Sequence, residues 1–202
     1  MPTARQSLPG DLFRSRAFFN GLFIAAIVVA TVLVVRLFPQ PHSTAYAYPT
    51  GGSGYDVSFP QCGAALPETG DFGVVGATGG RAFTENPCIS SEFQWAESAS
   101  RAPTFYMNLN FPSGSTASEG VTGPAGTCGP ADLRCGAYNY GWNAASFAFA
   151  WAKQNNASAS LWWLDIETVN SWSPDVSLND AVLEGAVDAI EAHDATAGVY
   201  ST

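Results

Sequence analysis

Basic residues are scarce in this sequence, with 8 Lys and Arg against 17 Asp and Glu and a formal net charge of −9. Half of the basic residues lie at or before Arg36, so the rest of the chain carries four basic residues against sixteen acidic ones. Nucleic-acid-binding domains present clustered Lys and Arg to the phosphate backbone. The composition therefore argues against nucleic acid as a partner.

Metal-binding residues are also few, since the chain has four cysteines and two histidines. No Cys-x-x-Cys or His-x-His spacing occurs, and His42 and His193 lie far from the cysteines in sequence. The Gly-rich stretch at 76–80 lacks the lysine of a P-loop, and no Gly-x-Gly-x-x-Gly follows an expected strand. We therefore expect no metal and no cofactor.

Charged residues of either sign make up only 12 % of the chain, whereas aromatic residues make up 13 % and include six Trp. Disordered proteins have the opposite composition, with many charges and few aromatic residues. A chain of 202 residues is long enough for one domain of ordinary size or for part of a larger one. The composition thus predicts a folded domain with a sizeable core.

The longest apolar run, residues 17–35, contains no charged residue. As a helix it would be roughly 28 Å long, close to the thickness of a bilayer's hydrocarbon core. Three arginines precede it, so the positive-inside rule places residues 1–16 in the cytoplasm and exports the residues after the membrane segment 17–38. The Ala-x-Ala sequence ending at Ala47 would suit signal peptidase, so a signal anchor and a cleaved signal peptide both remain open. Residues 39–53 are rich in Pro, Gly and Ser, which is typical of a linker.

Short apolar strands and helical segments alternate after the linker. Strands are expected at 54–59, 72–78, 104–111, 160–167 and 197–201. Helices are expected at 90–100, 143–155 and 178–193, and a long loop at 112–136. Such alternation is typical of βα units on a parallel sheet. It predicts a (β/α) TIM-type barrel in residues 54–202. A whole barrel needs about 250 residues, so we expect this segment to contain only the part up to the fifth strand.

All four cysteines lie after the membrane segment, and an even number is typical of an oxidising compartment. Three pairings are possible from the sequence alone. Cys62 and Cys88 follow the first two strands and so lie at the same end of the sheet, while Cys128 and Cys135 enclose a short loop. We therefore favour Cys62–Cys88 and Cys128–Cys135, since the crossed pairings would pull the long loop across the barrel mouth.

The segment Leu161–Glu167 (LWWLDIE) carries the strongest chemical signal. Alternate residues of a strand share a face, so Trp163, Asp165 and Glu167 point to one side. Asp56 of the first strand points the same way, which predicts a cluster of carboxylates at the C-terminal mouth of the barrel, within about 10 Å of one another. Like charges that close raise the pKa of one carboxyl, so that one carboxyl can act as a general acid while its neighbour stays ionised.

Four segments in order resemble a known family: GYDVS at 54–58, FGVVGATGG at 72–80, WLDIET at 163–168 and GVYS at 198–201. They are similar to the family 25 glycoside hydrolases, and more so to related exported glycoside-hydrolase-like domains of actinobacterial type. Those lysozymes are irregular β/α barrels that cut the muramic acid–glucosamine linkage of peptidoglycan. The resemblance implies that Glu167 is the general acid, that Asp165 orients the acetamido group of the substrate, and that Asp56 supports the site.

The sugar-binding surroundings differ from that family's pattern. The third strand reads YMNLNF at 106–111 where those lysozymes have a Tyr-His-aromatic motif, and GATGG at 76–80 replaces a Lys-Ala-Thr-Glu-Gly stretch. Asn108 and Asn110 thus become candidate substrate-binding residues in place of the usual ones. Aromatic residues expected in loops beyond the third and fourth strands could stack on sugar rings: Tyr138, Tyr140, Trp142 and Trp172.

The sequence therefore predicts an exported, membrane-tethered glycoside hydrolase, lysozyme-like, that acts on peptidoglycan or a related wall polysaccharide. It would be a single-pass membrane protein with an extracellular domain, or a secreted one if cleaved after Ala47. The alternative is a glycan-binding module of the same fold without turnover, because the acids are present while part of the usual surroundings is not.

Overall fold

The structure, a computed structural model, describes residues 51–201. The expected cytoplasmic segment 1–16, the membrane segment 17–38 and most of the linker 39–53 lie outside the described residues. Within residues 51–201, no helix is both long and apolar enough to cross a membrane.

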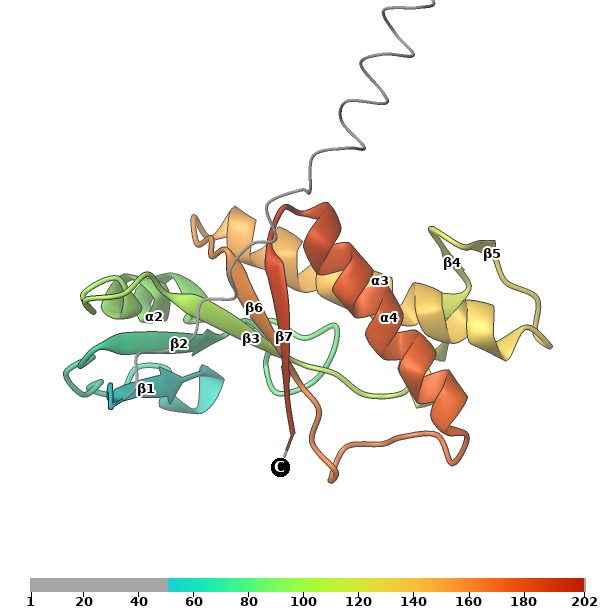
Figure 1. The fold of residues 1–202 in the computed structure, drawn as a ribbon, viewed down its shortest axis with the longest axis horizontal. Helices are drawn as coiled ribbons and strands as arrows, with labels where there is room; N and C mark the ends of the chain where they lie inside the picture. The colour runs from blue at the N-terminus through green and yellow to red at the C-terminus, as the bar shows by residue number, and fades with distance from the viewer. Residues whose placement is uncertain (1–50, 202) are drawn as a thin grey trace, which may run out of the picture. The chain divides into compact units, whose positions relative to one another are not determined.

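Five parallel strands form one sheet whose spatial order follows the chain order, β1-β2-β3-β6-β7 (Figure 1). The strands are β1 (Gly54–Val57), β2 (Phe72–Gly76), β3 (Thr104–Asn108), β6 (Leu161–Asp165) and β7 (Thr196–Tyr200). A doubly wound sheet reverses its strand order partway across, whereas a barrel adds each strand beside the previous one. The sheet thus has the order of one side of a β/α barrel.

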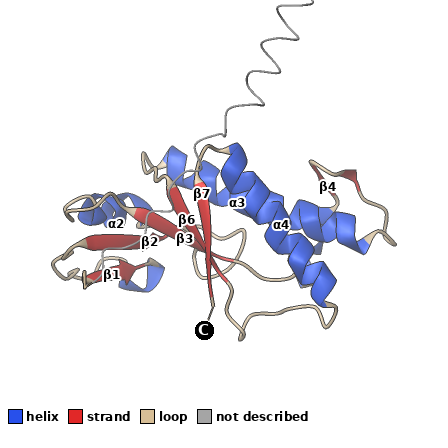
Figure 2. Cartoon of the chain, viewed as in Figure 1, coloured by secondary structure: helices blue, strands red, loops and turns tan. Residues whose placement is uncertain are grey.

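Three α-helices connect the strands, as the cartoon in Figure 2 shows. They are α2 (Ile89–Ala96), α3 (Leu133–Gln154) and α4 (Val176–Ala192). Two short 3₁₀ helices, η1 (Phe59–Gln61) and η2 (Gly114–Gly120), follow β1 and β3. A small antiparallel hairpin of β4 (Thr122–Gly123) and β5 (Gly126–Thr127) precedes α3.

The five expected strands and three expected helices are confirmed in order and type, but the loop expected at 112–136 is wrong. That segment contains η2, the β4–β5 hairpin and the first turn of α3. The helix begins ten residues earlier than expected because the Asp132 side chain caps it, accepting a hydrogen bond from the Cys135 backbone N–H at 3.2 Å. Gly136 and Gly141 lower the helix propensity of this segment, so the sequence does not predict that the helix begins here.

The helices cover one face of the sheet, and that face is apolar. Strand residues of this face are buried at 2 % exposure or less: Val57, Val75, Phe105, Met107, Trp162 and Leu164. Phe105 and Phe149 both pack on Trp162, with ring centroids 4.7 and 4.0 Å away. These rings tie β3, β6 and α3 together, so the alternation predicted for Trp162 and Leu164 is confirmed.

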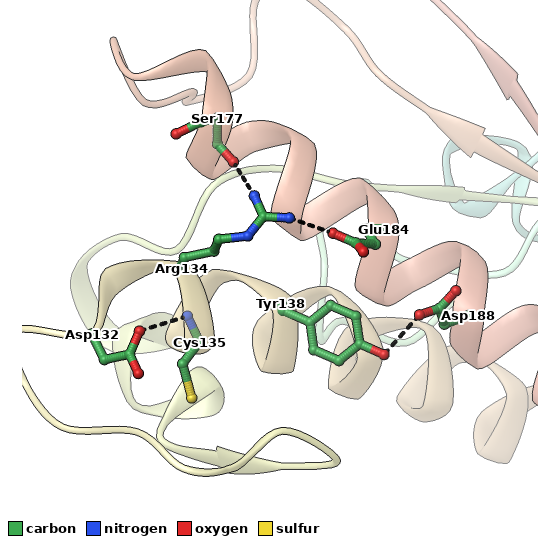
Figure 3. A network of polar contacts seen from close by, with 7 residues as sticks. All are labelled: Asp132, Arg134, Cys135, Tyr138, Ser177, Glu184 and Asp188. Carbon is green, nitrogen blue, oxygen red and sulfur yellow. Dashed lines mark hydrogen bonds and ion pairs between the residues drawn. The ribbon is translucent and has the colours of Figure 1, made fainter.

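Small residues let α3 and α4 pack with their backbones in contact. A Cβ added to Gly141 would lie 1.8 Å from the Val182 carbonyl oxygen, and one added to Gly185 would lie 2.0 Å from the Tyr138 carbonyl oxygen. Polar contacts line the edge of this crossing (Figure 3). Arg134 forms an ion pair with Glu184 at 2.7 Å and donates to the Ser177 carbonyl.

Both predicted disulfides are confirmed. Cys62 pairs with Cys88 and Cys128 with Cys135, with Cα atoms 5.5 and 5.6 Å apart. The first connects the loop after β1 to the N-terminus of α2, and the second connects the β4–β5 hairpin to the first turn of α3. All cysteines are therefore used in structural cross-links.

The α3–α4 crossing gives a stability test. Gly185→Ala should lower the free energy of unfolding by about 2–3 kcal/mol, because the new methyl group meets backbone atoms that cannot move without separating the helices. Gly129→Ala is the control, since a Cβ at that exposed loop position meets no atom within 4 Å. Urea unfolding compares the two, and equal midpoints would contradict the packing argument.

Candidate functional site

The carboxyl ends of the last three strands bring polar side chains into one row. The register pairs Asn108 of β3 with Asp165 of β6, and Asp165 with Tyr200 of β7. Residues paired across parallel strands point to the same face. This row lies on the face opposite the helices, which in a barrel is the interior.

Asp165 is the centre of this row and is only 2 % exposed. Its Oδ2 atom accepts a hydrogen bond from Asn108 Nδ2 at 2.6 Å, and the Tyr200 hydroxyl is a second side-chain partner of the carboxylate. Asn108 is itself fixed by the Thr78 hydroxyl, which donates to Asn108 Oδ1 at 2.8 Å. Asp165 Oδ1 is buried and has no hydrogen-bond partner among residues 51–201. One oxygen of a rigidly held carboxyl group is thus left to accept a donor or to hold a proton.

The same surroundings change the acidity of Asp165. Burial is the main cause of a raised pKa, the charges of Glu167 and Asp56 raise it further, and the Tyr200 hydrogen bond opposes the rise. The result is a pKa of about 6 for Asp165. The resemblance led us to expect a raised pKa on Glu167, as the general acid; the structure gives one on Asp165, the more deeply buried carboxyl of the pair.

Glu167 lies just after the end of β6 and is half-buried. The strand was expected to continue to Glu167, but it ends at Asp165, after which the Ile166 backbone N–H donates to the Tyr200 carbonyl. The Glu167 carbonyl oxygen accepts hydrogen bonds from the Trp172 indole at 2.9 Å and from the Asn170 backbone N–H at 3.1 Å. These bonds hold the backbone at Glu167 while its side chain is more accessible than that of Asp165.

Asp56 lines a shallow hollow of about 260 Å³ on the same face, together with Val74, Tyr106, Trp163 and Tyr200. The predicted inward orientation of Asp56 and Trp163 therefore agrees with the structure. Burial raises the pKa of Tyr106, and the charges of Asp56 and Asp165 add to this rise. The hollow thus combines aromatic surface with a carboxylate at its rim.

The two candidate asparagines have different surroundings. Asn108 is buried and bonded on both sides, so within this structure it positions Asp165. Asn110 is partly buried and donates to the Tyr140 hydroxyl at 3.0 Å and to the Phe111 carbonyl at 2.8 Å.

The expected loop aromatics separate into two groups. Trp172 does lie in the loop after β6, beside Glu167. The other three were expected in a loop, and this is wrong, because they lie on α3: Tyr138, Tyr140 and Trp142.

Their positions on α3 explain where these rings point. Tyr140 is fully buried. Tyr138 donates to Asp188 of α4 at 2.8 Å (Figure 3), and burial together with this carboxylate raises the pKa of Tyr138 to about 12. Trp142 lines a hollow with Ala157 and Ser158, which precede β6, at the opposite end of the strands from Asp165.

Sequence reasoning did not single out three residues of the site: Thr78, Tyr106 and Tyr200. Tyr200 could have been found, because a fifth strand parallel to 161–165 places Gly198 and Tyr200 on the face of Trp163 and Asp165. Thr78 lies beyond the end of β2, where the alternation of a strand no longer indicates to which side a residue points. Within residues 51–201, no group of three or more His, Cys, Asp or Glu side chains is arranged to hold a metal ion.

The comparison with known proteins finds a resemblance in structure but not in sequence. No protein-family model matches the sequence, and no curated protein matches it. Among solved structures, the modular autolysin LytC from Streptococcus pneumoniae is similar over 72 % of this chain, with a TM-score of 0.48 and 12 % sequence identity. The matched region spans 31 % of the LytC chain.

The raised pKa of Asp165 predicts how stability depends on pH. The folded state binds this proton more tightly than an unfolded chain with a pKa near 3.8, so the contribution is complete below about pH 4 and is lost as pH rises through about 6. The loss amounts to roughly 3 kcal/mol. Asp165→Asn has no such proton, so its stability relative to the wild type should rise by up to this amount between pH 4 and pH 8. Urea unfolding at both values measures it, and a difference that does not change with pH would contradict the assignment.

Proposed function

We propose that this protein is an exported glycoside hydrolase that cuts a wall polysaccharide of the peptidoglycan type. The observation that carries the proposal is the buried Asp165 carboxyl, with one unpaired oxygen and a pKa near 6, beside Glu167 at the carboxyl edge of a parallel sheet. Burying a carboxyl group that is not fully hydrogen-bonded costs stability, so such groups concentrate at functional sites. Carboxyl pairs at the ends of barrel strands are the usual equipment for glycosidic cleavage.

Each acid has a distinct proposed role. Glu167, the more accessible one, donates its proton to the glycosidic oxygen as the C1–O bond breaks. Asp165 Oδ1 accepts the N–H of a neighbouring acetamido group, which turns the acetamido oxygen toward C1 to form the new bond. Water, deprotonated by Glu167, then opens this cyclic intermediate and restores the acetamido group. Asp56 adds negative charge that favours the positive charge developing on the sugar.

The loop residue Trp172 and the rings at the floor of the hollow supply the apolar surface that sugar rings need. Trp172 is fixed through its indole N–H to the Glu167 carbonyl, so a sugar stacked on it would lie close to the acid pair. Tyr106 and Trp163 line the hollow beside Asp56. Tyr138 and Trp142 are not included in this proposed site, because both lie on α3 away from Asp165.

The catalytic role of Glu167 is tested by the release of soluble fragments from purified cell wall. Glu167→Gln keeps the shape and removes the proton, so release should fall at least about 100-fold while folding and wall binding persist. Glu191→Gln is the matched control, because Glu191 is exposed near the end of α4, and it should retain full activity. Unchanged release by Glu167→Gln would instead favour a glycan-binding module of the same fold.

Export and the membrane tether belong to the same proposal. The two disulfides suit an oxidising compartment. Protease added to intact cells should therefore digest residues 54–201, while full-length chain should remain in the membrane fraction before digestion. Recovery of an intact domain from protease-treated cells would contradict export, and recovery of the untreated chain only from the medium would favour cleavage after Ala47.

A further inference from the structure

A second hollow, of about 510 Å³, lies among the loops that come after β2, β3 and β6. It is lined mainly by hydroxyl and amide side chains, including Thr84, Asn110, Ser113, Thr116, Asn170 and Ser171. Arg81 also lines it, and none of the described residues that line it is acidic. In a chain with an excess of acidic residues, this hollow is therefore neutral to basic.

Hydrogen bonds to Thr84 hold the loop that carries Arg81. The Gly79 backbone N–H donates to the Thr84 carbonyl at 3.4 Å, and the Arg81 backbone N–H donates to the Thr84 hydroxyl at 3.3 Å. Phe83 has a positive φ of 58°, which is strained for a bulky residue, and its ring packs against Tyr140 with centroids 5.1 Å apart. Phe83 anchors the loop inward, and the exposed Arg81 side chain is free to meet a ligand.

Arg81 differs from the other cations of residues 51–201. Arg134 is engaged by Glu184, Arg101 precedes β3, and Lys153 lies near the end of α3, before β6. Arg81 comes after β2, so it lies at the carboxyl end of the strands, and no ion pair engages it within the described chain. A guanidinium group placed this way presents a planar set of donors suited to carboxylate or phosphate.

A residue that lines the hollow is hydrogen-bonded to the backbone of Glu167. Asn170, which lines it, donates through its backbone to the Glu167 carbonyl and through Nδ2 to the Leu109 carbonyl at 3.2 Å. On the other side, Thr78 contacts Asn108 three residues before Arg81. A polymer lying across the ends of the strands would thus reach the acids and Arg81 together.

We propose that Arg81 and this polar hollow form a subsite for an oxyanion, carboxylate or phosphate, carried by the wall polymer. The inference rests on the proposed function, because it places the subsite next to Glu167. It gives the acidic protein an attractive contact for an anionic wall that would otherwise repel it. The hydroxyl and amide groups of the hollow bind the neutral parts of the sugar, and Arg81 binds the part of the wall polymer that bears the negative charge.

The test measures binding of the full chain in detergent to purified sacculi in a pelleting assay. Three preparations are used: untreated sacculi, sacculi with amidated carboxyl groups, and sacculi stripped of phosphodiester polymers with hydrofluoric acid. Arg81→Gln should weaken binding to untreated sacculi about five- to tenfold, as expected for one charge-assisted contact. Arg81→Lys should recover part of the loss, since it keeps the charge but not the planar donors. Arg101→Gln makes the same charge change before β3, at the opposite end of the sheet from Arg81, and this variant should bind like the wild type.

The two treatments identify the source of the oxyanion. If amidation removes the difference between wild type and Arg81→Gln, the ligand is a carboxylate; if acid stripping removes it, the ligand is a phosphate. Equal binding by wild type and Arg81→Gln, or an equal loss in Arg101→Gln, would overturn the subsite while leaving the proposed hydrolase intact. Weakened binding by Arg81→Gln together with unchanged hydrolysis by Glu167→Gln would support the subsite and reject the hydrolase.

Discussion

The register of the parallel sheet is the constraint on which the candidate site depends. The parallel pairing of β3, β6 and β7 aligns Asn108 with Asp165 and Asp165 with Tyr200. These three residues therefore lie side by side, although 92 positions separate the first from the last. A slip of β6 by one residue against β3 would turn Asp165 toward the apolar face that the helices cover, and would separate it from Asn108. The Thr78 hydroxyl extends the same row to the end of β2 through Asn108. The register that builds the fold thereby also fixes the position of the buried carboxyl group.

The apolar face of the sheet supplies the stability that the polar face lacks. Trp162 is packed between rings of β3 and α3, and the α3–α4 crossing brings backbones into contact through Gly141 and Gly185. Close packing of this kind gains dispersion energy over many atoms. The opposite face holds Asp165 at a cost, since its carboxyl group is charged above about pH 6 and only partly hydrogen-bonded. Natural domains often tolerate such a cost where a site needs a perturbed group.

Much of the fold could be predicted because periodicity is a local property. The alternation in Leu161–Glu167 correctly places Trp162 inside, and the positions of the cysteines relative to the strands correctly pair them. The start of α3 could not be predicted, since Gly141 is explained only by its contact with α4, which lies more than 30 residues further along the chain. The deep burial of Asp165 could not be predicted either, because sequence spacing does not reveal which of two neighbouring carboxyl groups is buried. The position of Tyr200 in the site could have been predicted, but only by assuming that β6 and β7 are parallel neighbours.

The distribution of charge connects the two hollows at the carboxyl ends of the strands. The charges of Asp56 and Glu167 both act on Asp165; in the proposed hydrolase they would favour a cationic transition state but repel an anionic polymer. A cation placed among the acids would neutralise them and lower the pKa of Asp165 toward its usual value. Arg81 instead lies in the loop after β2, and it lines a separate hollow whose described lining includes neither Asp165 nor Glu167. In the hydrolase that we propose, this separation would let an anionic polymer be attracted at one place while the acids keep the field that bond cleavage needs at another.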